Sequence, residues 1–120
     1  MRIADLTFEP AVILAPMSGI SDQPFRRTVR KFGADLVISE MIASDAVLRA
    51  VRSEIRKMST NCSGEFPMAV QLAGSDPKLM AEAAKINEDR GAAIIDINFG
   101  CPARKVTTKV CGSALMRNEK

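Results

Sequence analysis

Four short apolar runs recur along the chain, and amphipathic segments separate most of them. The runs are Ala11–Ala15, Leu36–Ser39, Met68–Ala73 and Ala93–Ile97. Ala93-Ile94-Ile95 is apolar at consecutive positions, which is typical of parallel strands covered by helices and not of a half-solvated antiparallel sheet. The pattern predicts a parallel sheet in which strands and helices alternate.

Three helices are expected between these runs. One spans Asp22–Phe32 and is followed by Gly33, a residue common just after a helix. A second covers roughly Ser44–Met58, with apolar residues on one face at Val47, Leu48, Val51 and Ile55. The third begins at Ser75-Asp76-Pro77, a capping residue with proline in the first turn, and stops at Gly91. Residues 59–67 are expected to form a polar connection between helix and strand.

Parallel strands joined by helical crossovers form either an open doubly wound sheet or a (β/α)8 barrel. The sequence contains no Gly-x-Gly-x-x-Gly motif, which favours the barrel. A barrel of this kind needs about 250 residues, whereas this chain has 120. We therefore expect the N-terminal portion, about four βα units, of a (β/α)8 TIM barrel. An unclosed sheet leaves an open edge, so these residues alone should be poorly stable or self-associate.

Composition is that of an ordinary globular protein, with 47% hydrophobic and 26% charged residues. Charges within Met1–Asp5 stand where a secretory signal would need an apolar core, so we expect no such signal, and the run Ala11–Ala15 is too short to span a bilayer. We expect a cytoplasmic protein without membrane contact. Three cysteines without a Cys-x-x-Cys pair, and the lack of histidine, argue against a disulfide framework and a zinc site.

Basic charge gathers near the C-terminal end of the chain. Residues 1–100 carry 12 basic and 13 acidic side chains, whereas residues 101–120 carry five basic side chains and one acidic one. A polyanion such as nucleic acid would be attracted there. A solvated charged loop is the alternative interpretation.

Polar groups are expected to converge where the strands end, because ligands lie at the carboxyl ends of the strands in both architectures. The first two strands lead into Pro16-Met17-Ser18-Gly19 and Glu40-Met41, the third contains Gln71, and the fourth ends in Asn98–Cys101. Such small residues, amides and one carboxylate suit a flat heteroaromatic ring. Gln71 in a buried strand must find hydrogen-bond partners. Glu40 either points into water or binds a backbone amide.

Cys101 has the setting of a functional thiol. Gly100 can adopt backbone angles closed to other residues, and Pro102 favours an extended Cys101, so a stiff turn should present the thiol. An ordinary thiol is mostly protonated at neutral pH, so Cys101 could donate a proton. Nucleophilic attack would need a thiolate, and no histidine is available to generate it. Cys62 and Cys111 lack this setting and are expected to be structural.

Several motifs together resemble the tRNA-dihydrouridine synthases, flavoenzymes that reduce specific uridines in tRNA, and look most like the bacterial branch. They follow one another in order over nearly the whole chain: Ala15–Asp22 with Pro24-Phe25-Arg26, Ser39-Glu40-Met41, Val70–Pro77, Asp96–Pro102 with Lys105-Val106, and Gly112–Leu115. One departure is Val110-Cys111, which stands where many members have a small glycine-rich stretch.

The resemblance implies a domain organisation and a cofactor. Residues 1–120 would be a truncated FMN-binding TIM-barrel catalytic domain, whereas the C-terminal half-barrel and a helical RNA-binding domain would lie outside this chain. In the family, NADPH reduces the FMN, which passes a hydride to C6 of the uracil ring, and a cysteine protonates C5. The fragment alone is expected to bind FMN weakly and to be inactive, and the full-length protein is expected to be a monomer that acts on tRNA.

The resemblance also implies roles for individual residues of this chain, according to their positions in the matching motifs. Cys101 matches the catalytic cysteine, and Asn98 matches the asparagine that holds the target base. Pro16, Met17 and Ser18 match the loop beside the flavin, and Gln71 matches a flavin-ring contact. Arg104, Lys105 and Lys109 become candidate phosphate or base-flanking contacts to tRNA.

Two other functions remain open. One is another FMN barrel that handles pyrimidines, such as a dihydroorotate or dihydropyrimidine dehydrogenase, although the basic cluster after Cys101 favours RNA. The other is a tRNA-binding barrel without redox activity, because a fold does not fix a function.

Overall fold

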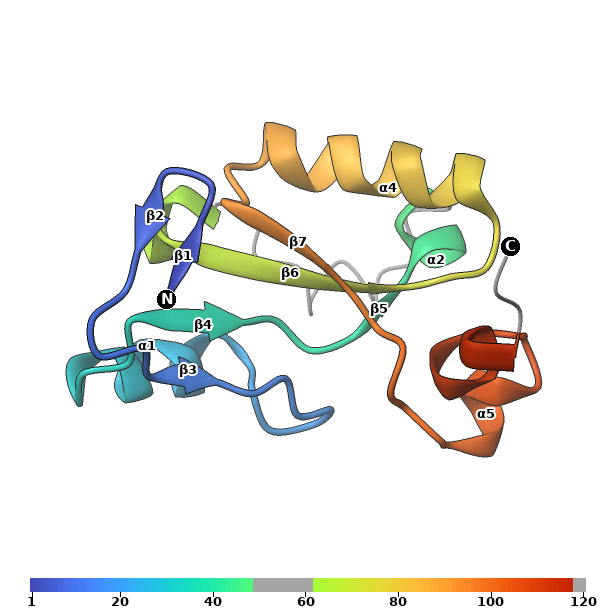
Figure 1. The fold of residues 1–120 in the computed structure, drawn as a ribbon, viewed down its shortest axis with the longest axis horizontal. Coiled ribbons are helices and arrows are strands. Elements are labelled where there is room, and N and C mark those ends of the chain that lie inside the picture. Colours follow the sequence, from blue (N-terminus) through green and yellow to red (C-terminus); the bar gives the residue numbers. More distant parts are fainter. Residues whose placement is uncertain (49–61, 118–120) are drawn as a thin grey trace.

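The computed structural model describes residues 1–48 and 62–117, and its centre is one parallel sheet (Figure 1). The sheet contains β3 (Ile13–Leu14), β4 (Leu36–Ile38), β5 (Ile42–Ala43), β6 (Met68–Ala73) and β7 (Ile94–Ile97). β4 and β5 follow one another along one side of β6, and β7 pairs with its other side. The predicted parallel sheet is therefore confirmed.

β3 pairs with β4, both β4 and β5 pair with β6, and β7 also pairs with β6, so the neighbours in the sheet follow the order of the chain. An open doubly wound sheet instead reverses its strand order at a switch point. Within the described residues the sheet shows no such reversal. The fold is thus an α/β fold with a parallel sheet, in which successive strands of the chain are added in one direction across the sheet.

Four α-helices accompany the sheet in the described residues, namely α1 (Gln23–Lys31), α2 (Ser44–Leu48), α4 (Pro77–Asp89) and α5 (Arg104–Thr107), together with 3₁₀ helices at Cys62–Glu65 and Gly112–Arg117. The helices predicted over 22–32 and from 75 to 91 are confirmed. Asp22 caps α1 by accepting a hydrogen bond from the Phe25 amide, and Asp76 caps α4 in the same way through two amides.

The second predicted helix is confirmed only where the structure describes it. α2 starts at Ser44, as expected, and Val47 is buried in the core. The remainder of the predicted range, including Val51 and Ile55, lies outside the described residues.

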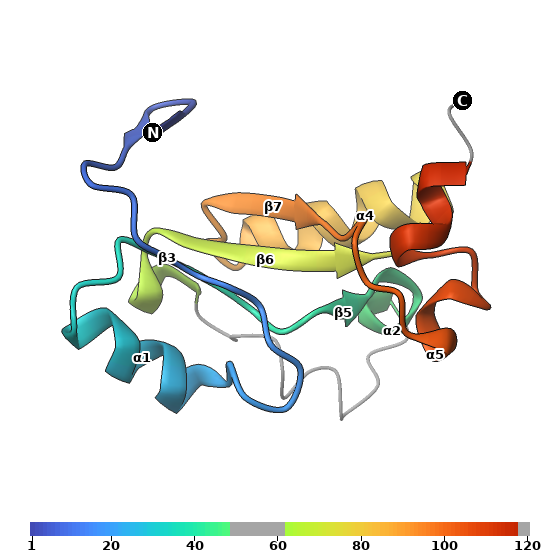
Figure 2. The same ribbon diagram turned by 60° about the horizontal axis from the view of Figure 1, so that its bottom comes forward.

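Three local features differ from the expectation. The second strand is interrupted between Ile38 and Ile42, where the Ser39 hydroxyl accepts a hydrogen bond from the Gln71 amide at 3.1 Å. A 3₁₀ helix occupies residues 62–65 of the predicted polar connection. An N-terminal antiparallel hairpin, β1 (Arg2–Ile3) with β2 (Leu6–Thr7), lies at the opposite end of the sheet from α5 (Figure 2).

The two faces of β6 have different surroundings because side chains alternate along a strand. Met68, Val70 and Leu72 share a buried cluster with Ala83 of α4, which runs along β6 and β7 in Figure 1. Ala69 belongs to a second cluster with Phe8 and Leu36. Gln71, two residues after Ala69, therefore projects from the face that α4 does not cover, near the carboxyl end of the strand.

A buried ion pair joins α1 to the segment before β6. The Arg26 guanidinium donates to both carboxylate oxygens of Glu65, each at 3.0 Å, and both side chains are only 1% exposed. A third guanidinium bond, at 2.8 Å, goes to the carbonyl of Ser21. Arg26 thus also holds the end of the loop that precedes α1.

Candidate active site

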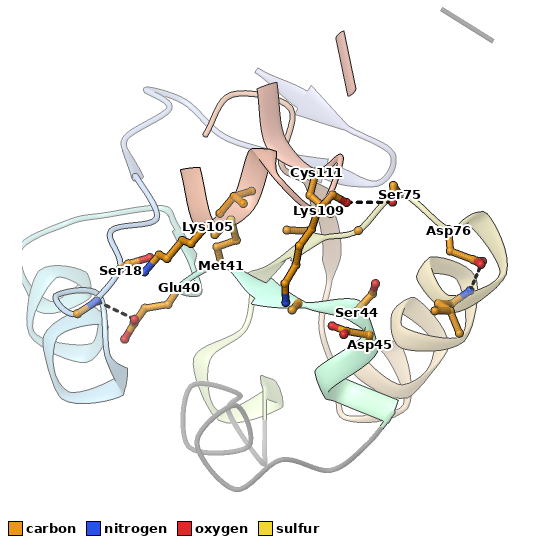
Figure 3. Close-up of a pocket in the computed structure, with 16 residues that line it drawn as sticks. Ser18, Glu40, Met41, Ser44, Asp45, Ser75, Asp76, Lys105, Lys109 and Cys111 are labelled. Atoms are coloured by element: carbon orange, nitrogen blue, oxygen red, sulfur yellow. Dashed lines mark hydrogen bonds between the residues drawn. The ribbon is translucent and has the colours of Figure 1, made fainter. Parts of the chain in front are cut away.

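A pocket of about 810 Å³ opens at the carboxyl ends of the strands (Figure 3). Its lining comes from the loop after β3, the β4–β5 break, the segment after β6, and the α5 region. In a parallel sheet these segments meet at one edge even though they are far apart in the sequence. The pocket therefore lies at the sheet edge where the sequence predicts a site.

The loop after β3 is held by two side chains. Glu40, which is 6% exposed, accepts a hydrogen bond from the Gly19 amide at 2.7 Å. The buried Ser21 hydroxyl bonds both the amide and the carbonyl of Met17. Of the two interpretations for Glu40, the structure supports binding of a backbone amide. Ser18 lines the pocket, whereas Pro16 and Met17 are half-buried and do not line it.

Gln71 and Asn98 lie together, as predicted, and a third residue joins them. Gln71 Nε2 donates to Asp96 Oδ2 at 2.6 Å, and Asn98 Nδ2 donates to Gln71 Oε1 at 2.9 Å. These two bonds engage one N–H and the oxygen of the buried Gln71 amide, which is 7% exposed. The three side chains form a hydrogen-bonded row across β6 and β7.

The same row holds the turn that carries Cys101. Asn98 Oδ1 accepts hydrogen bonds from the amides of Gly100 at 3.2 Å and Cys101 at 2.9 Å. The Cys101 carbonyl in turn accepts from the Ser113 amide at 3.0 Å. The half-buried cysteine is thus fixed on both sides, as a stiff turn requires.

The reason for this stiffness differs from the expectation. Gly100 does not have a φ in the left-handed region, and a Cβ atom there would meet nothing within 4 Å. Gly112 is the constrained glycine, with φ of +61°, and a Cβ on it would lie 2.5 Å from the Cys101 carbonyl oxygen. The expectation that Gly100 uses glycine-only angles is therefore wrong, and Gly112 permits the close approach of two backbone segments.

Basic side chains reach the pocket from α5 and the residues after it. In Figure 3, Lys105 extends toward Ser18, and Lys109 extends toward Ser44 and Asp45. Arg104, the third predicted basic residue, is exposed on α5 but does not line the pocket.

Sequence reasoning missed two contributors to this edge of the sheet. Asp96 was expected only as part of a motif, although its carboxylate anchors Gln71. Cys111, expected to be structural, is half-buried and also lines the pocket, whereas Cys62 is fully buried. Asp96 could have been found from the alternation of β7, because it faces the same side as Asn98.

Metal clusters and membrane-spanning helices are both absent from the described part of the chain. Residues 1–48 and 62–117 contain no cluster of three potential metal-binding side chains. In the same residues, no helix has the length and apolar character needed to cross a membrane.

The fold and site define an α/β protein with a pocket of mixed polar and apolar lining at the carboxyl edge of a parallel sheet. Gln71, Asn98 and Cys101 are held together by hydrogen bonds but do not line this pocket. A family model for dihydrouridine synthase matches residues 13–120. The chain therefore belongs to the dihydrouridine synthase family.

Curated relatives agree with this assignment. The chain is 52% identical over 119 residues to a probable tRNA-dihydrouridine synthase of Rickettsia bellii, and 56% identical over 118 residues to one of Rhodobacter capsulatus. It is 47% identical over 119 residues to tRNA-dihydrouridine synthase B of Xanthomonas campestris. These matches cover 98–99% of the chain, which spans 36% of the length of each relative.

Proposed function

We propose that the protein containing this chain reduces specific uridines in tRNA to 5,6-dihydrouridine. Two findings support the proposal: membership of the family, and a cysteine held rigidly beside two hydrogen-bonded amides at the ligand edge of the sheet. The single observation that carries it is the pair of bonds from the Gly100 and Cys101 amides to Asn98. These bonds tie the Cys101 backbone to the Asn98 side chain, which is the group that we propose binds the base.

The chain would form the first part of a (β/α)8 barrel. The strand order, which follows the chain without reversal in the described residues, supports this architecture over a doubly wound sheet. The rest of the barrel and an RNA-binding domain would be formed by the part of the relatives' length that this chain does not span.

The residues present fit an FMN ring. Gln71 keeps one N–H free after its bond to Asp96, and a carboxamide N–H matches the carbonyl and ring-nitrogen acceptors of a flavin. The half-buried Pro16 and Met17 offer apolar contact, and Ser18 a hydroxyl. Bound FMN, reduced by NADPH, would supply the hydride for C6 of the uracil ring.

Cys101 would supply the proton. The ring gains a hydride at C6 and a proton at C5, so one C=C bond becomes single and two C–H bonds form. The thiol serves as the general acid and is reprotonated from solvent. Asn98 would hold the base, which must leave the RNA stack to reach this turn. Arg104 and Lys105 would contact flanking phosphates.

The test is mass mapping of tRNA from cells that lack the endogenous enzyme and carry the full-length protein. Specific uridines should gain two hydrogens, and Cys101→Ala should abolish the gain. A protein that binds tRNA but adds no hydrogens would instead be a non-catalytic binder. Reduction of free uracil or oxidation of dihydroorotate, without any change in tRNA, would point to a different pyrimidine oxidoreductase.

A further inference from the structure

The hydrogen bonds around Gln71 form one continuous row with a direction. The row runs from the Asp96 carboxylate through the amides of Gln71 and Asn98 to the backbone N–H groups of Gly100 and Cys101. Its terminal groups have opposite and fixed character. An ionised carboxylate can only accept hydrogen bonds, and a backbone N–H can only donate.

These two ends determine the orientation of both amides. Because Asp96 only accepts, Gln71 must turn its NH₂ group toward Asp96 and its oxygen toward Asn98. Asn98 must then turn its NH₂ group toward Gln71 and its oxygen toward the turn, where two N–H groups donate to it. Reversing either amide would bring like groups together, two donors or two acceptors, and reversing Gln71 would leave the polar atoms of a buried side chain without partners, at about 1–3 kcal/mol each.

The fixed orientation limits what Asn98 can offer a ligand. Its oxygen has two lone pairs, and the amides of Gly100 and Cys101 use both. Its NH₂ group has two N–H bonds, and Gln71 uses one. Asn98 therefore presents a donor, and no acceptor, to whatever lies beside Cys101.

We propose that Asp96 is a positioning residue that sets the direction of this row, so that Asn98 holds the Cys101 turn and presents an N–H donor to a carbonyl oxygen of the substrate ring. The substrate part rests on the proposed function, since uracil offers carbonyl oxygens. The exocyclic amino group of cytosine would instead face this donor with a second donor. Asp96 itself need touch neither substrate nor cofactor.

The experiment measures amide hydrogen exchange at Gly100 and Cys101 in the full-length protein. Gln71→Glu places a second carboxylate against Asp96 and breaks the row, so exchange at both amides should rise by about tenfold or more. Asp96→Asn combined with Gln71→Glu restores a donor opposite an acceptor at every step. In this double variant the new amide at position 96 and the amide of Asn98 both donate to the new carboxylate at position 71. Exchange should then return to within about threefold of wild type.

Matched controls distinguish the loss of this hydrogen-bonded row from a general loss of stability. Asp89→Asn removes an exposed carboxylate of α4 and should leave both amides unchanged. Exchange at Val70 and Leu72 reports whether β6 remains folded. If Gln71→Glu fails to fold, Gln71→Met removes both hydrogen bonds without adding charge and should give the same rise at Gly100 and Cys101.

Two results would overturn the proposal: unchanged exchange at Gly100 and Cys101 in the folded Gln71 variant, or a double variant no better protected than Gln71→Glu. The kcat of dihydrouridine formation tests the part of the proposal that concerns the substrate. Because a carboxylate at position 71 lacks the N–H proposed to contact the flavin, the double variant should recover protection of the turn but not the full kcat. If the double variant rescues exchange but the wild-type full-length protein makes no dihydrouridine, the proposed function is refuted and the role of Asp96 stays intact.

Discussion

Gly112 packs directly against Cys101, so closely that a Cβ atom on it would lie 2.5 Å from the Cys101 carbonyl oxygen. The same carbonyl accepts the Ser113 amide. The segment after α5 thus supports the turn at the Cys101 carbonyl, whereas Asn98 binds the Cys101 amide. The position of Cys101 depends on two distinct parts of the chain, which hold the peptide groups on either side of this residue.

Gly112→Ala should displace this turn. The added methyl group would clash with the Cys101 carbonyl and with Val106, and alanine is strained at a φ of +61°. We expect dihydrouridine formation by the full-length protein to fall at least about tenfold, since small misplacements of a reacting group are costly. Gly64→Ala, where a Cβ meets nothing within 4 Å, is the matched control. Equal activity of the two variants would contradict the packing argument.

Glu65→Gln should destabilise the protein strongly. It leaves the Arg26 guanidinium buried without its counterion, and breaking one partner of a buried pair costs about 3–5 kcal/mol. Urea unfolding measures the loss. Replacing both residues, by Arg26→Met with Glu65→Leu, should recover most of it. Glu82→Gln on the exposed face of α4 is the control and should change stability by less than about 0.5 kcal/mol.

Val110→Gly should stabilise the protein slightly. Val110 has φ of +57°, a region that β-branched residues rarely adopt and that costs about 1–2 kcal/mol. Its side chain is 56% exposed, so little packing is lost. The greater chain entropy of glycine offsets about 0.5–1 kcal/mol of the gain. Val12→Gly, at a similarly exposed valine without positive φ, should destabilise instead. A lower melting temperature for Val110→Gly would contradict this account.

Lys105→Ala and Lys109→Ala should each weaken tRNA binding and reduce its salt dependence. Both ammonium groups extend into the pocket, and each phosphate contact contributes about one unit to the slope of log affinity against log salt. Fluorescence binding assays over a salt series measure both quantities. Lys85→Ala on the exposed surface of α4 is the control. An unchanged slope in both pocket variants would remove these lysines from the tRNA interface.

The sequence predicted the regular elements well where local signals were strong. Asp76 caps α4 at the predicted helix start, and the apolar run at Met68–Ala73 forms β6 with those bounds. Asp22, which the prediction included in the first helix, is the cap of α1. The break between β4 and β5 was not predicted, because the hydrogen bond found there joins Ser39 and Gln71, which are 32 positions apart. The short strands of the N-terminal hairpin carry too few residues for a recognisable alternation.

The site was predicted in place but not in its contacts. Gln71 and Asn98 could be expected at one sheet edge, because both stand near the carboxyl ends of buried strands. Their bond to each other depends on the pairing register of β6 with β7, which sets Gln71 opposite Asp96. No local pattern gives that register. The ion pair of Arg26 with Glu65 was missed for the same reason, since the two residues are 39 positions apart.

The most direct test of the central claim is a single-turnover measurement with the NADPH-reduced full-length protein and an unmodified tRNA. If Cys101 delivers the proton to C5, Cys101→Ser should slow dihydrouridine formation by about 10²–10⁴-fold and leave flavin reduction by NADPH unchanged. Cys111→Ser, at the other half-buried cysteine, should stay within about threefold of wild type. Dihydrouridine formed at the wild-type rate by Cys101→Ser would contradict the account.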